Sequence, residues 1–380
     1  MGRNSKIELK ARLKEFQSTP NSHIMGHHGP TMERKEAAMA NSSKRFSTRL
    51  LIERSTASVI MTLVIFWLAV NFIKSPSQFF QASVIGISNG VLYALIALGY
   101  TLVYGIIELI NFAHGDLFML GGLFAATFIS TWFGQEEASG TGFAVFFLCL
   151  IAVMGFCATI NVAIERFAYR RLRRAPKLAP LITAVGVSFI IQFVGIRWNG
   201  SGPKTWNSVL PAGEFVISGV HIAYTTIISF LVTIPLLILM TFIVTKTRRG
   251  KAMRATAQDA DAARLMGINV NKTIGFTFAL GGALAGAAGL LFQQTRGVTN
   301  YNLGYQLGLI AFTSAVLGGI GNLSGAVLGA ILIGLIQGLN DGLPIGLGQQ
   351  WSQTVVFTIL ILLMVFKPTG LLGKPMIEKV

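Results

Sequence analysis

The chain has 380 residues, of which 52% are hydrophobic and only 12% are charged, and its formal net charge at pH 7 is +16. Several apolar runs reach the roughly 18 residues that are needed to cross a hydrocarbon core about 30 Å thick. This composition excludes a soluble enzyme and indicates a polytopic α-helical membrane protein. The positive charge does not indicate a nucleic-acid partner, because the basic residues gather between the apolar runs, where they set the topology.

Residues 1–54 form a polar segment with eleven Lys and Arg against five Glu. A segment of this length is not the n-region of a secretory signal peptide, so no cleaved leader is expected. We expect a basic, disordered cytoplasmic tail that is dispensable for activity, since no apolar surface in it demands burial.

The rest of the chain, residues 55–373, is predicted to be one membrane domain, followed by a short cytoplasmic end at 374–380. The region 307–339 is interrupted by several Gly, Asn and Ser residues. It is predicted to form two half-length helices that meet at a polar break, because irregular backbone at membrane depth survives only inside protein or beside water. The predicted full spans are residues 55–73, 84–106, 117–133, 142–164, 181–196, 221–244, 273–293 and 351–366.

The distribution of basic residues orients these spans. If both termini are cytoplasmic, 27 of the 31 Lys and Arg lie on the cytoplasmic side, and the other four are Lys74, Arg197, Lys204 and Arg296. The count holds only if the region 307–339 returns to the side that it entered from. The predicted fold is therefore an all-α bundle of about eight full spans plus one re-entrant helical hairpin, with both termini cytoplasmic.

The loop at residues 246–272 carries seven basic residues between two apolar spans. Its centre is predicted to be a short helix, with Thr256 as the N-cap, Asp259 as the acidic partner of a capping box and Gly267 at the end. Small residues at Ala260, Ala263 and Gly267 would give this helix one smooth face. Such a helix fits docking into a soluble partner, and an ordinary cytoplasmic loop remains the alternative.

A second polar segment, Asn111 to Asp116, lies between two predicted spans. It fits either a gate or a hydrogen-bonded cap where two helices meet. The predicted span interiors contain no Asp, Glu, Lys or Arg, which argues against an ion-driven carrier. The chain also has no P-loop and no metal-site spacing, and Cys149 and Cys157 are too far apart along one helix for a disulfide. Energy for uphill transport would have to come from a partner.

Several motifs resemble the permeases of branched-chain amino acid ABC importers, and within that family the LivH-type subunit. They are the runs Asn89–Tyr100 and Asn111–Gly115, the run Asp261–Asn269 in the basic loop, and the Gly-rich runs at 281–290 and 318–325. The resemblance covers roughly residues 80–373. Asp261 departs from the family, whose docking motif more usually opens with Glu.

The resemblance implies a multi-pass subunit of the bacterial plasma membrane, in contact with lipid. Its partners would be a second related permease, two ATP-binding subunits and an extracytoplasmic amino-acid-binding protein. ATP would bind only to the partner subunits, so this chain would hold no cofactor or metal and have no catalytic residue. The implied ATPase-docking residues are Thr256, Asp259, Asp261, Ala262, Ala263 and Gly267. The candidate gate or helix cap is Asn111, His114, Gly115 and Asp116, and the candidate translocation path is Asn89, Tyr93, Tyr100, Asn322 and Ser324.

Two other functions stay open. Related permeases import urea or short amides, and Phe112 leans toward the amino-acid branch of the family. A channel or secondary carrier that works alone is the alternative from a different class.

Overall fold

The computed structural model describes residues 62–109, 111–134, 142–173, 175–176, 178–367 and 369–373. The predicted tail and the end at 374–380 lie outside these residues, as does the first part of the predicted span 55–73. The remainder of that span is a short apolar helix, Thr62–Lys74. The chain divides into two compact units at Leu68 and Ala69, and the description below concerns the second unit.

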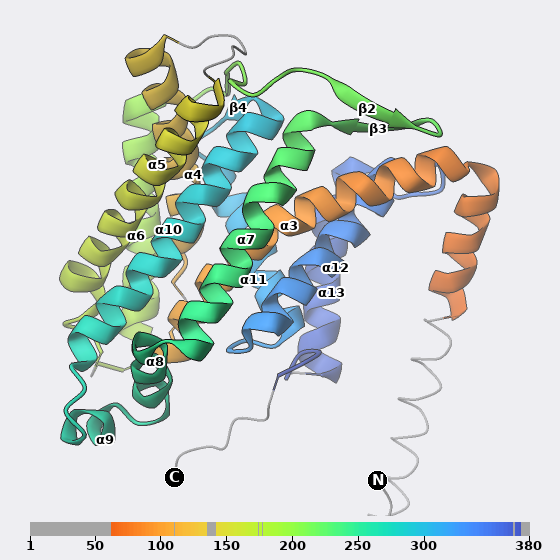
Figure 1. Cartoon of the computed structure of the whole chain (residues 1–380). Coiled ribbons are helices and arrows are strands. Elements are labelled where there is room, and N and C mark those ends of the chain that lie inside the picture. Colours follow the sequence, from red (N-terminus) through yellow and green to blue (C-terminus); the bar gives the residue numbers. More distant parts are fainter. Residues whose placement is uncertain are drawn as a thin grey trace, which may run out of the picture. The chain divides into compact units, whose positions relative to one another are not determined.

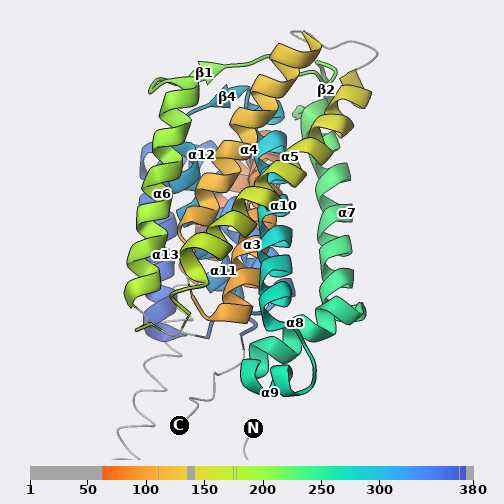
Figure 2. The same ribbon diagram turned by 90° about the vertical axis from the view of Figure 1, so that its left-hand side faces the viewer.

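The second unit is a bundle of helices (Figures 1 and 2). Within the described residues, eight helices are long and apolar enough to cross a membrane, which confirms the predicted polytopic helical class. The helices are α3 (Pro76–Ile107), α4 (Ala113–Phe128), α5 (Gly142–Ile164), α6 (Leu178–Asn199), α7 (Tyr224–Lys246), α8 (Arg248–Gln258), α9 (Ala260–Leu265), α10 (Val270–Arg296), α11 (Leu303–Gly318), α12 (Leu323–Gly342) and α13 (Ser352–Phe366). Short π- or 3₁₀-helical turns are η1 (Ile129–Phe133), η2 (Glu165–Tyr169) and η3 (Gln349–Trp351).

Four short strands modify the all-α prediction. Strand β1 (Lys204–Thr205) pairs antiparallel with β4 (Val298–Thr299), and β2 (Glu214–Ile217) pairs antiparallel with β3 (Val220–Ala223). The predicted span 221–244 therefore begins too early, since its first three residues belong to β3. A two-residue turn at Ser218 and Gly219, both with positive φ, closes this hairpin and could have been recognised from the Ser-Gly pair.

Helix α3 lies at the centre of the bundle, with most of its second half buried. It packs along α12 through glycines that let the two backbones touch. A Cβ atom added at Gly90 would lie 2.8 Å from the Cα of Ile331, and one added at Gly334 would lie 2.3 Å from the Gly90 nitrogen. Close approach of this kind holds membrane helices together by van der Waals contact. Gly282 and Gly286 of α10 likewise meet the α5 backbone.

The break in the region 307–339 lies where the sequence predicts it, between α11 and α12, but α12 has 20 residues, is long enough to cross a membrane and is therefore not half-length. Asn322 caps α12 by accepting a hydrogen bond from the Gly325 backbone nitrogen at 3.1 Å. The turn lies at the end of the bundle beside the C-terminal segment, where the backbone nitrogens of Leu371 and Leu372 donate to the carbonyls of Leu317 and Gly318. Position 321 of the turn lies next to Gly105, near the C-terminal end of α3.

The basic loop contains two helices, and its predicted capping is wrong. Thr256 is buried inside α8 and caps nothing, because α8 begins eight residues earlier, at Arg248, with Thr247 as its N-cap. Asp259 breaks the chain into α8 and α9: its backbone is extended, and its carboxylate accepts from the nitrogens of Asp261 and Ala262. An Asp that competes in this way for backbone donors starts a new helix.

Gly267 ends α9 as predicted, with φ at +82°. The backbone nitrogen of Gly267 donates to the Arg264 carbonyl and that of Ile268 to the Ala263 carbonyl, which is the Schellman arrangement. A side chain at position 267 would meet no neighbouring atom within 4 Å, so only backbone conformation favours glycine there.

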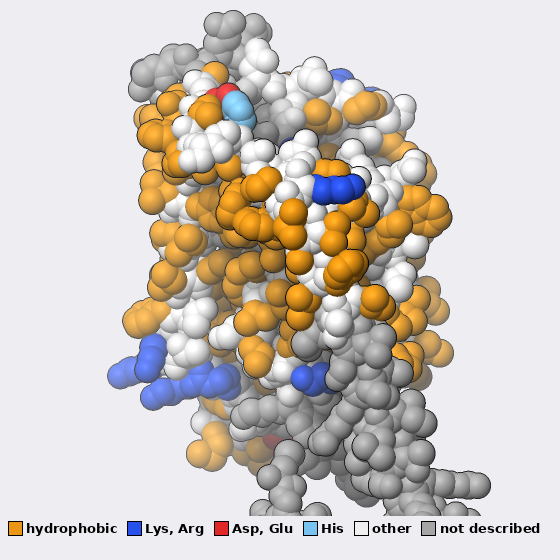
Figure 3. Space-filling model, turned by 90° about the vertical axis from the view of Figure 1, so that its right-hand side faces the viewer, with side chains coloured by type: hydrophobic (Ala, Val, Ile, Leu, Met, Phe, Trp, Pro, Cys, Tyr) orange, Lys and Arg blue, Asp and Glu red, His pale blue; other side chains and the backbone are white. Residues whose placement is uncertain are grey.

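The surface of the bundle is a broad apolar belt. On the face shown in Figure 3, hydrophobic side chains cover the middle, and Lys and Arg side chains gather along its lower edge. Exposed apolar side chains are frequent on α5, α6, α7 and α13. We call the end that carries α8 and α9 the basic end, and the end that carries β2 and β3 the hairpin end; α7 connects the two (Figure 1).

Candidate functional site

The helix pair α8–α9 presents a small apolar surface to solvent at the basic end. Leu265 and Met266 are 89% and 82% exposed, although both are large apolar side chains. Beside them Arg264 donates to Asp261 at 2.8 Å, and this ion pair is itself exposed. Exposed apolar residues rimmed by polar ones mark surfaces that bind other proteins.

The predicted docking residues differ in their solvent exposure. Asp259, Asp261, Ala262 and Gly267 are exposed on α9 or at its ends, whereas Thr256 and Ala263 are buried against the rest of the chain. The predicted smooth face of Ala260, Ala263 and Gly267 is therefore not fully exposed, because Ala263 is buried. Leu265 and Met266 were missed, although two large apolar residues before a helix-ending glycine were a visible signal.

Two basic side chains of α8 fix this helix to the bundle, and a third, Arg173, links η2 to α10. Arg254 donates to the Val244 carbonyl at the end of α7, and the Arg249 guanidinium lies 4.7 Å from the ring centre of Phe276 on α10. Arg173 forms an ion pair with the buried Glu165 and donates to Asn271 Oδ1 at 2.8 Å.

Burial lowers the pKa of the Arg173 guanidinium, and the Glu165 carboxylate acts in the opposite direction. The ion pair is nevertheless formed, and through Asn271 it reaches the first turn of α10. The contacts of Arg249 and Arg254 attach α8 to α10 and to the end of α7.

A cluster of polar side chains lies inside the bundle, and we call it the polar cluster: Asn111, His114, Asp116, Tyr169, Ser188 and Gln192. The Tyr169 hydroxyl donates to Asn111 Oδ1 at 2.7 Å, and the Ser188 hydroxyl donates to Asp116. Gln192 Nε2 donates to Ser188 Oγ at 3.1 Å. Four elements therefore meet here: the start of α4, η2, α6 and the segment that precedes α4.

The predicted polar segment is the first turn of α4 and not a separate connection. His114 packs against Gly99, where a Cβ atom would lie 2.3 Å from His114 Nε2, and its ring centre lies 4.8 Å from that of Tyr100. Gly99 is eight residues before the end of α3, which is about 12 Å along a helix. The chain thus turns back into the bundle after α3, and Gly115 contacts the backbone of Gly304 on α11.

Asp116 corrects the expectation that the span interiors contain no acidic residue. Asp116 is fully buried within the apolar helix Ala113–Trp132. The sequence had instead placed it just outside a predicted span. The sequence pattern gave the wrong location for Asp116 because the first turn of α4 lies inside the bundle and is surrounded by other helices. Within the described residues, the two ring nitrogens of His114 have no hydrogen-bond partner. Asp116 Oδ1 likewise accepts no hydrogen bond there.

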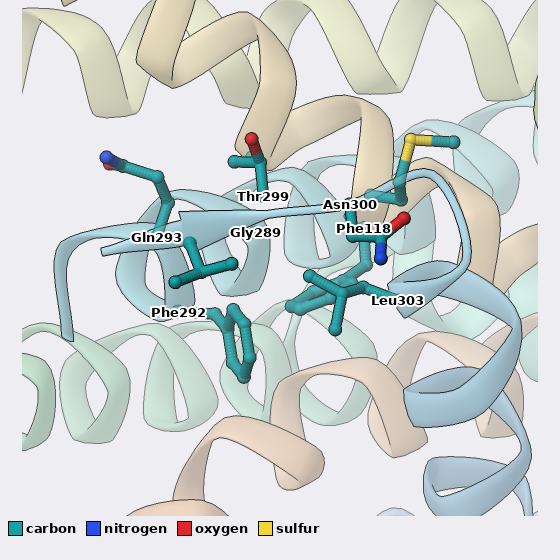
Figure 4. A pocket seen from close by; sticks show the side chains of 10 residues that line it. Phe118, Gly289, Phe292, Gln293, Thr299, Asn300 and Leu303 are labelled. Carbon is teal, nitrogen blue, oxygen red and sulfur yellow. The ribbon is translucent and has the colours of Figure 1, made fainter. Parts of the chain in front are cut away.

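A small cavity lies between α4, α10 and the segment from β4 to α11. Figure 4 shows Phe118, Phe292 and Leu303 beneath the strand that carries Thr299, with Gln293 at one side. The cavity holds about 10 Å³, which is room for about one water molecule and far too little for an amino acid.

A larger cleft of about 290 Å³ lies at the hairpin end, between α3, the β2–β3 hairpin, the start of α7 and the end of α10. Asn89 lines this cleft and accepts a hydrogen bond of 2.6 Å from Arg296. Tyr93, one turn further along α3, is buried and donates to Gln337 Oε1 on α12 at 2.8 Å. Arg296 was not predicted as a site residue, although it was one of four basic residues expected on that side.

The residues of the predicted translocation path lie in two separate parts of the bundle. Asn89, Tyr93 and Tyr100 follow one another along α3, from the cleft to the polar cluster. Asn322 and Ser324 lie at the other end of α3, where the Asn322 amide donates to the Leu372 carbonyl at 2.8 Å. The visible role of Asn322 is structural, and it is not brought together with Asn89.

Comparison with known proteins agrees with the helical architecture. Residues 83–365 match the family described as "Branched-chain amino acid transport system / permease component". The high-affinity branched-chain amino acid transport system permease protein BraD of Pseudomonas aeruginosa is 40% identical over 80% of this chain and 98% of its own length. The corresponding permease protein LivH of Escherichia coli strain K12 is 35% identical over the same shares.

Among solved structures, PsaBC from Streptococcus pneumoniae in complex with Fab matches 80% of this chain and 96% of its own, with a TM-score of 0.39 and 17% identity, a likeness too weak to bear on function. The match over residues 83–365 and the identity to BraD and LivH along nearly their whole length are decisive. The chain belongs to the family of permease components of branched-chain amino acid transport systems.

Proposed function

We propose that this permease is one of two related membrane subunits of an ATP-driven importer in a bacterial plasma membrane. Together they form the path for branched-chain or other hydrophobic amino acids. Two ATP-binding subunits supply the energy, and an extracytoplasmic binding protein delivers the amino acid. The similarity to BraD and LivH, both permease proteins of high-affinity branched-chain amino acid transport systems, supports this assignment. ATP binds on the partner subunits, and this chain holds no cofactor and catalyses no reaction.

The observation that carries the coupling is the exposed apolar pair Leu265 and Met266 at the end of α9, which directly follows α8, the helix that Arg249 and Arg254 fix to the bundle. ATP binding moves the partner subunits, and α9, held in a groove on one of them, moves with it. The displacement passes to α7 and α10 and shifts the bundle between inward- and outward-facing states.

The topology of the proposal places both termini, α8 and α9 in the cytoplasm. Helices α11 and α12 form a helical hairpin that leaves the β2–β3 end of the bundle, turns at 319–322 and returns to the β2–β3 end. Two observations support this: α12 runs back along α3 through its glycines, and the turn bonds to residues 371 and 372 at the basic end.

A carrier driven by ions is the second candidate, and the buried Asp116 favours it, because intramembrane carboxylates commonly carry protons or cations. The Ser188 hydroxyl on Asp116 and its place at the start of α4 also fit a purely structural role. Import of urea or short amides remains a further alternative within the same kind of assembly.

Reconstitution of this chain with its four partner subunits in proteoliposomes tests the proposal. Leucine delivered by the binding protein accumulates when ATP is present inside the vesicles, and not when an ATPase subunit lacks its catalytic carboxylate. A proton or sodium ionophore leaves uptake unchanged. Uptake by this chain alone, or uptake abolished by the ionophore while ATP is maintained, would replace the importer with a carrier. Uptake of urea in preference to leucine would reassign the substrate.

A further inference from the structure

The cleft at the hairpin end combines positive charge, negative charge and apolar surface. Its walls come from α3, β2, β3, α7 and α10, which lie far apart in the sequence. A volume of about 290 Å³ is close to the lower limit of about 300 Å³ for small-molecule sites. It accommodates one small solute and no folded partner.

Arg296 supplies the positive pole. It is the last residue of α10, and Asn89 on α3 holds its guanidinium by accepting from Nη2 at 2.6 Å. That is the one hydrogen bond its guanidinium makes within the described part of the chain, so its other N–H groups remain for a ligand. A guanidinium oriented in this way binds a carboxylate through two parallel hydrogen bonds.

Glu214 supplies the negative pole. Its Oε1 lies 2.7 Å from His221 Nδ1 across the β2–β3 hairpin, and both side chains are about half exposed. Gln81 on α3 holds the hairpin in place, since its amide accepts from the His221 nitrogen at 2.7 Å and donates to the His221 carbonyl at 3.0 Å. Helix α3 therefore positions both poles, through Gln81 and Asn89.

The rest of the cleft lining is mixed. Val84, Ile85 and Leu92 on α3 and Ile222 on β3 are its large apolar side chains, and Ser88, Thr225, Thr226 and Thr295 add hydroxyl groups. The apolar side chains form a surface for a branched aliphatic group, whose burial is favourable by about 25 cal/mol per Å² of apolar area.

We propose that this cleft binds a free amino acid as its zwitterion, with the carboxylate on Arg296, the ammonium group on Glu214 and a branched apolar side chain against α3 and Ile222. It is a reception site of low affinity, occupied after the binding protein releases the solute and before the solute moves along α3. The inference rests on the proposed import function and adds the residues that select the solute in the membrane.

Equilibrium binding of radiolabelled leucine to the complete complex, without the binding protein, tests this directly. The complex is placed in nanodiscs of phosphatidylcholine and, in a second series, of phosphatidylethanolamine. Arg296→Gln and Glu214→Gln each weaken binding by about tenfold, the usual effect of losing one charge-assisted hydrogen bond. The matched control Lys204→Gln removes a basic group at the same end of the bundle, outside the cleft, and leaves binding unchanged.

Competition on the unmodified complex needs no variant to fold. Valine and isoleucine displace leucine, whereas 3-methylbutylamine, which lacks the carboxylate, and 4-methylpentanoate, which lacks the ammonium group, do not. Equal displacement by either analogue would overturn the two-pole site. Absence of saturable leucine binding together with retention of phosphatidylethanolamine that Arg296→Gln releases would assign the cleft to a lipid headgroup and also overturn it.

Measurement of ATP-driven uptake with the same complexes distinguishes failure of the proposed cleft site from failure of the proposed import function. Arg296→Gln raises the leucine–binding-protein concentration needed for half-maximal uptake, and coupling to ATP persists. Uptake by Arg296→Gln and Glu214→Gln that equals the unmodified rate at every concentration would refute the cleft and leave the importer intact. Failure of the unmodified complex to take up leucine would refute the importer itself.

Discussion

At the scale of single residues, Asp116 decides between the two candidate energy sources. Its carboxylate is fully buried, accepts from Ser188 and lies in the first turn of α4, where a helix N-terminus favours negative charge. In an ATP-driven permease this is a structural role. Removing the charge while keeping an acceptor for Ser188 then has little effect on transport.

We therefore expect Asp116→Asn to retain ATP-driven uptake near the unmodified rate, and Asp116→Leu to destabilise the protein by about 1–3 kcal/mol, because Ser188 loses its acceptor. Uptake in proteoliposomes and denaturant unfolding in detergent measure the two effects. If Asp116→Asn unfolds normally and yet abolishes uptake, the carboxylate carries charge in the transport cycle.

At the scale of elements, the proposed coupling depends on α9. Met266→Glu places a charge on an exposed apolar contact, so we expect uptake to fall at least tenfold and the ATPase subunits to dissociate during purification, while permease abundance is unchanged. Lys251→Glu on α8 is the control, since it changes the charge of an exposed side chain outside α9. ATPase subunits that stay bound to the Met266→Glu complex would move the docking surface elsewhere.

Gly267→Val tests the end of the same helix. Valine at a φ of +82° is strained by about 1–3 kcal/mol, although no neighbouring atom obstructs its side chain. We expect α9 to fray and coupling to weaken, as measured by ATP-driven uptake at unchanged expression. Gly267→Asn tolerates the left-handed conformation better and restores most of the uptake.

The close contact between α3 and α12 predicts that the glycines in it cannot be replaced by larger residues. Gly334→Val forces side-chain atoms into the α3 backbone, where even a Cβ would lie 2.3 Å from the Gly90 nitrogen. Gly155→Val on α5 is a matched control, because nothing lies within 4 Å of the Cβ that it adds. We expect the first variant to be degraded or to aggregate and the second to accumulate normally, as judged by detergent size-exclusion chromatography. Equal behaviour would show that α12 does not need close contact.

At the scale of the whole molecule, the proposed orientation predicts which side each loop faces. A cysteine at Ser201, exposed at the hairpin end, reacts with an impermeant thiol reagent added outside intact cells. A cysteine at Ala175 reacts only after permeabilisation. The native Cys149 and Cys157 are buried and do not contribute. Labelling of Ala175→Cys from outside would reverse the topology.

The sequence predicted most spans because their apolar runs end at charged or turn-forming residues; α5 begins and ends where the pattern placed it. It failed where tertiary contacts decide. The sequence predicted the residues of β3 as the start of a span because strands and helices are both built from apolar residues. The division into α8 and α9 was missed because it depends on the extended backbone of Asp259. The polar cluster joins Tyr169, Ser188 and Asp116 across 72 residues or fewer of sequence, a contact that no local spacing encodes.

The contact between the α11–α12 turn and residues 371 and 372 also sets an order of events during synthesis. The carbonyls of Leu317 and Gly318 acquire these backbone partners only after residues 371 and 372, 54 positions later, have been synthesised. A chain that stops at the end of α13 contains every described spanning helix and lacks both hydrogen bonds.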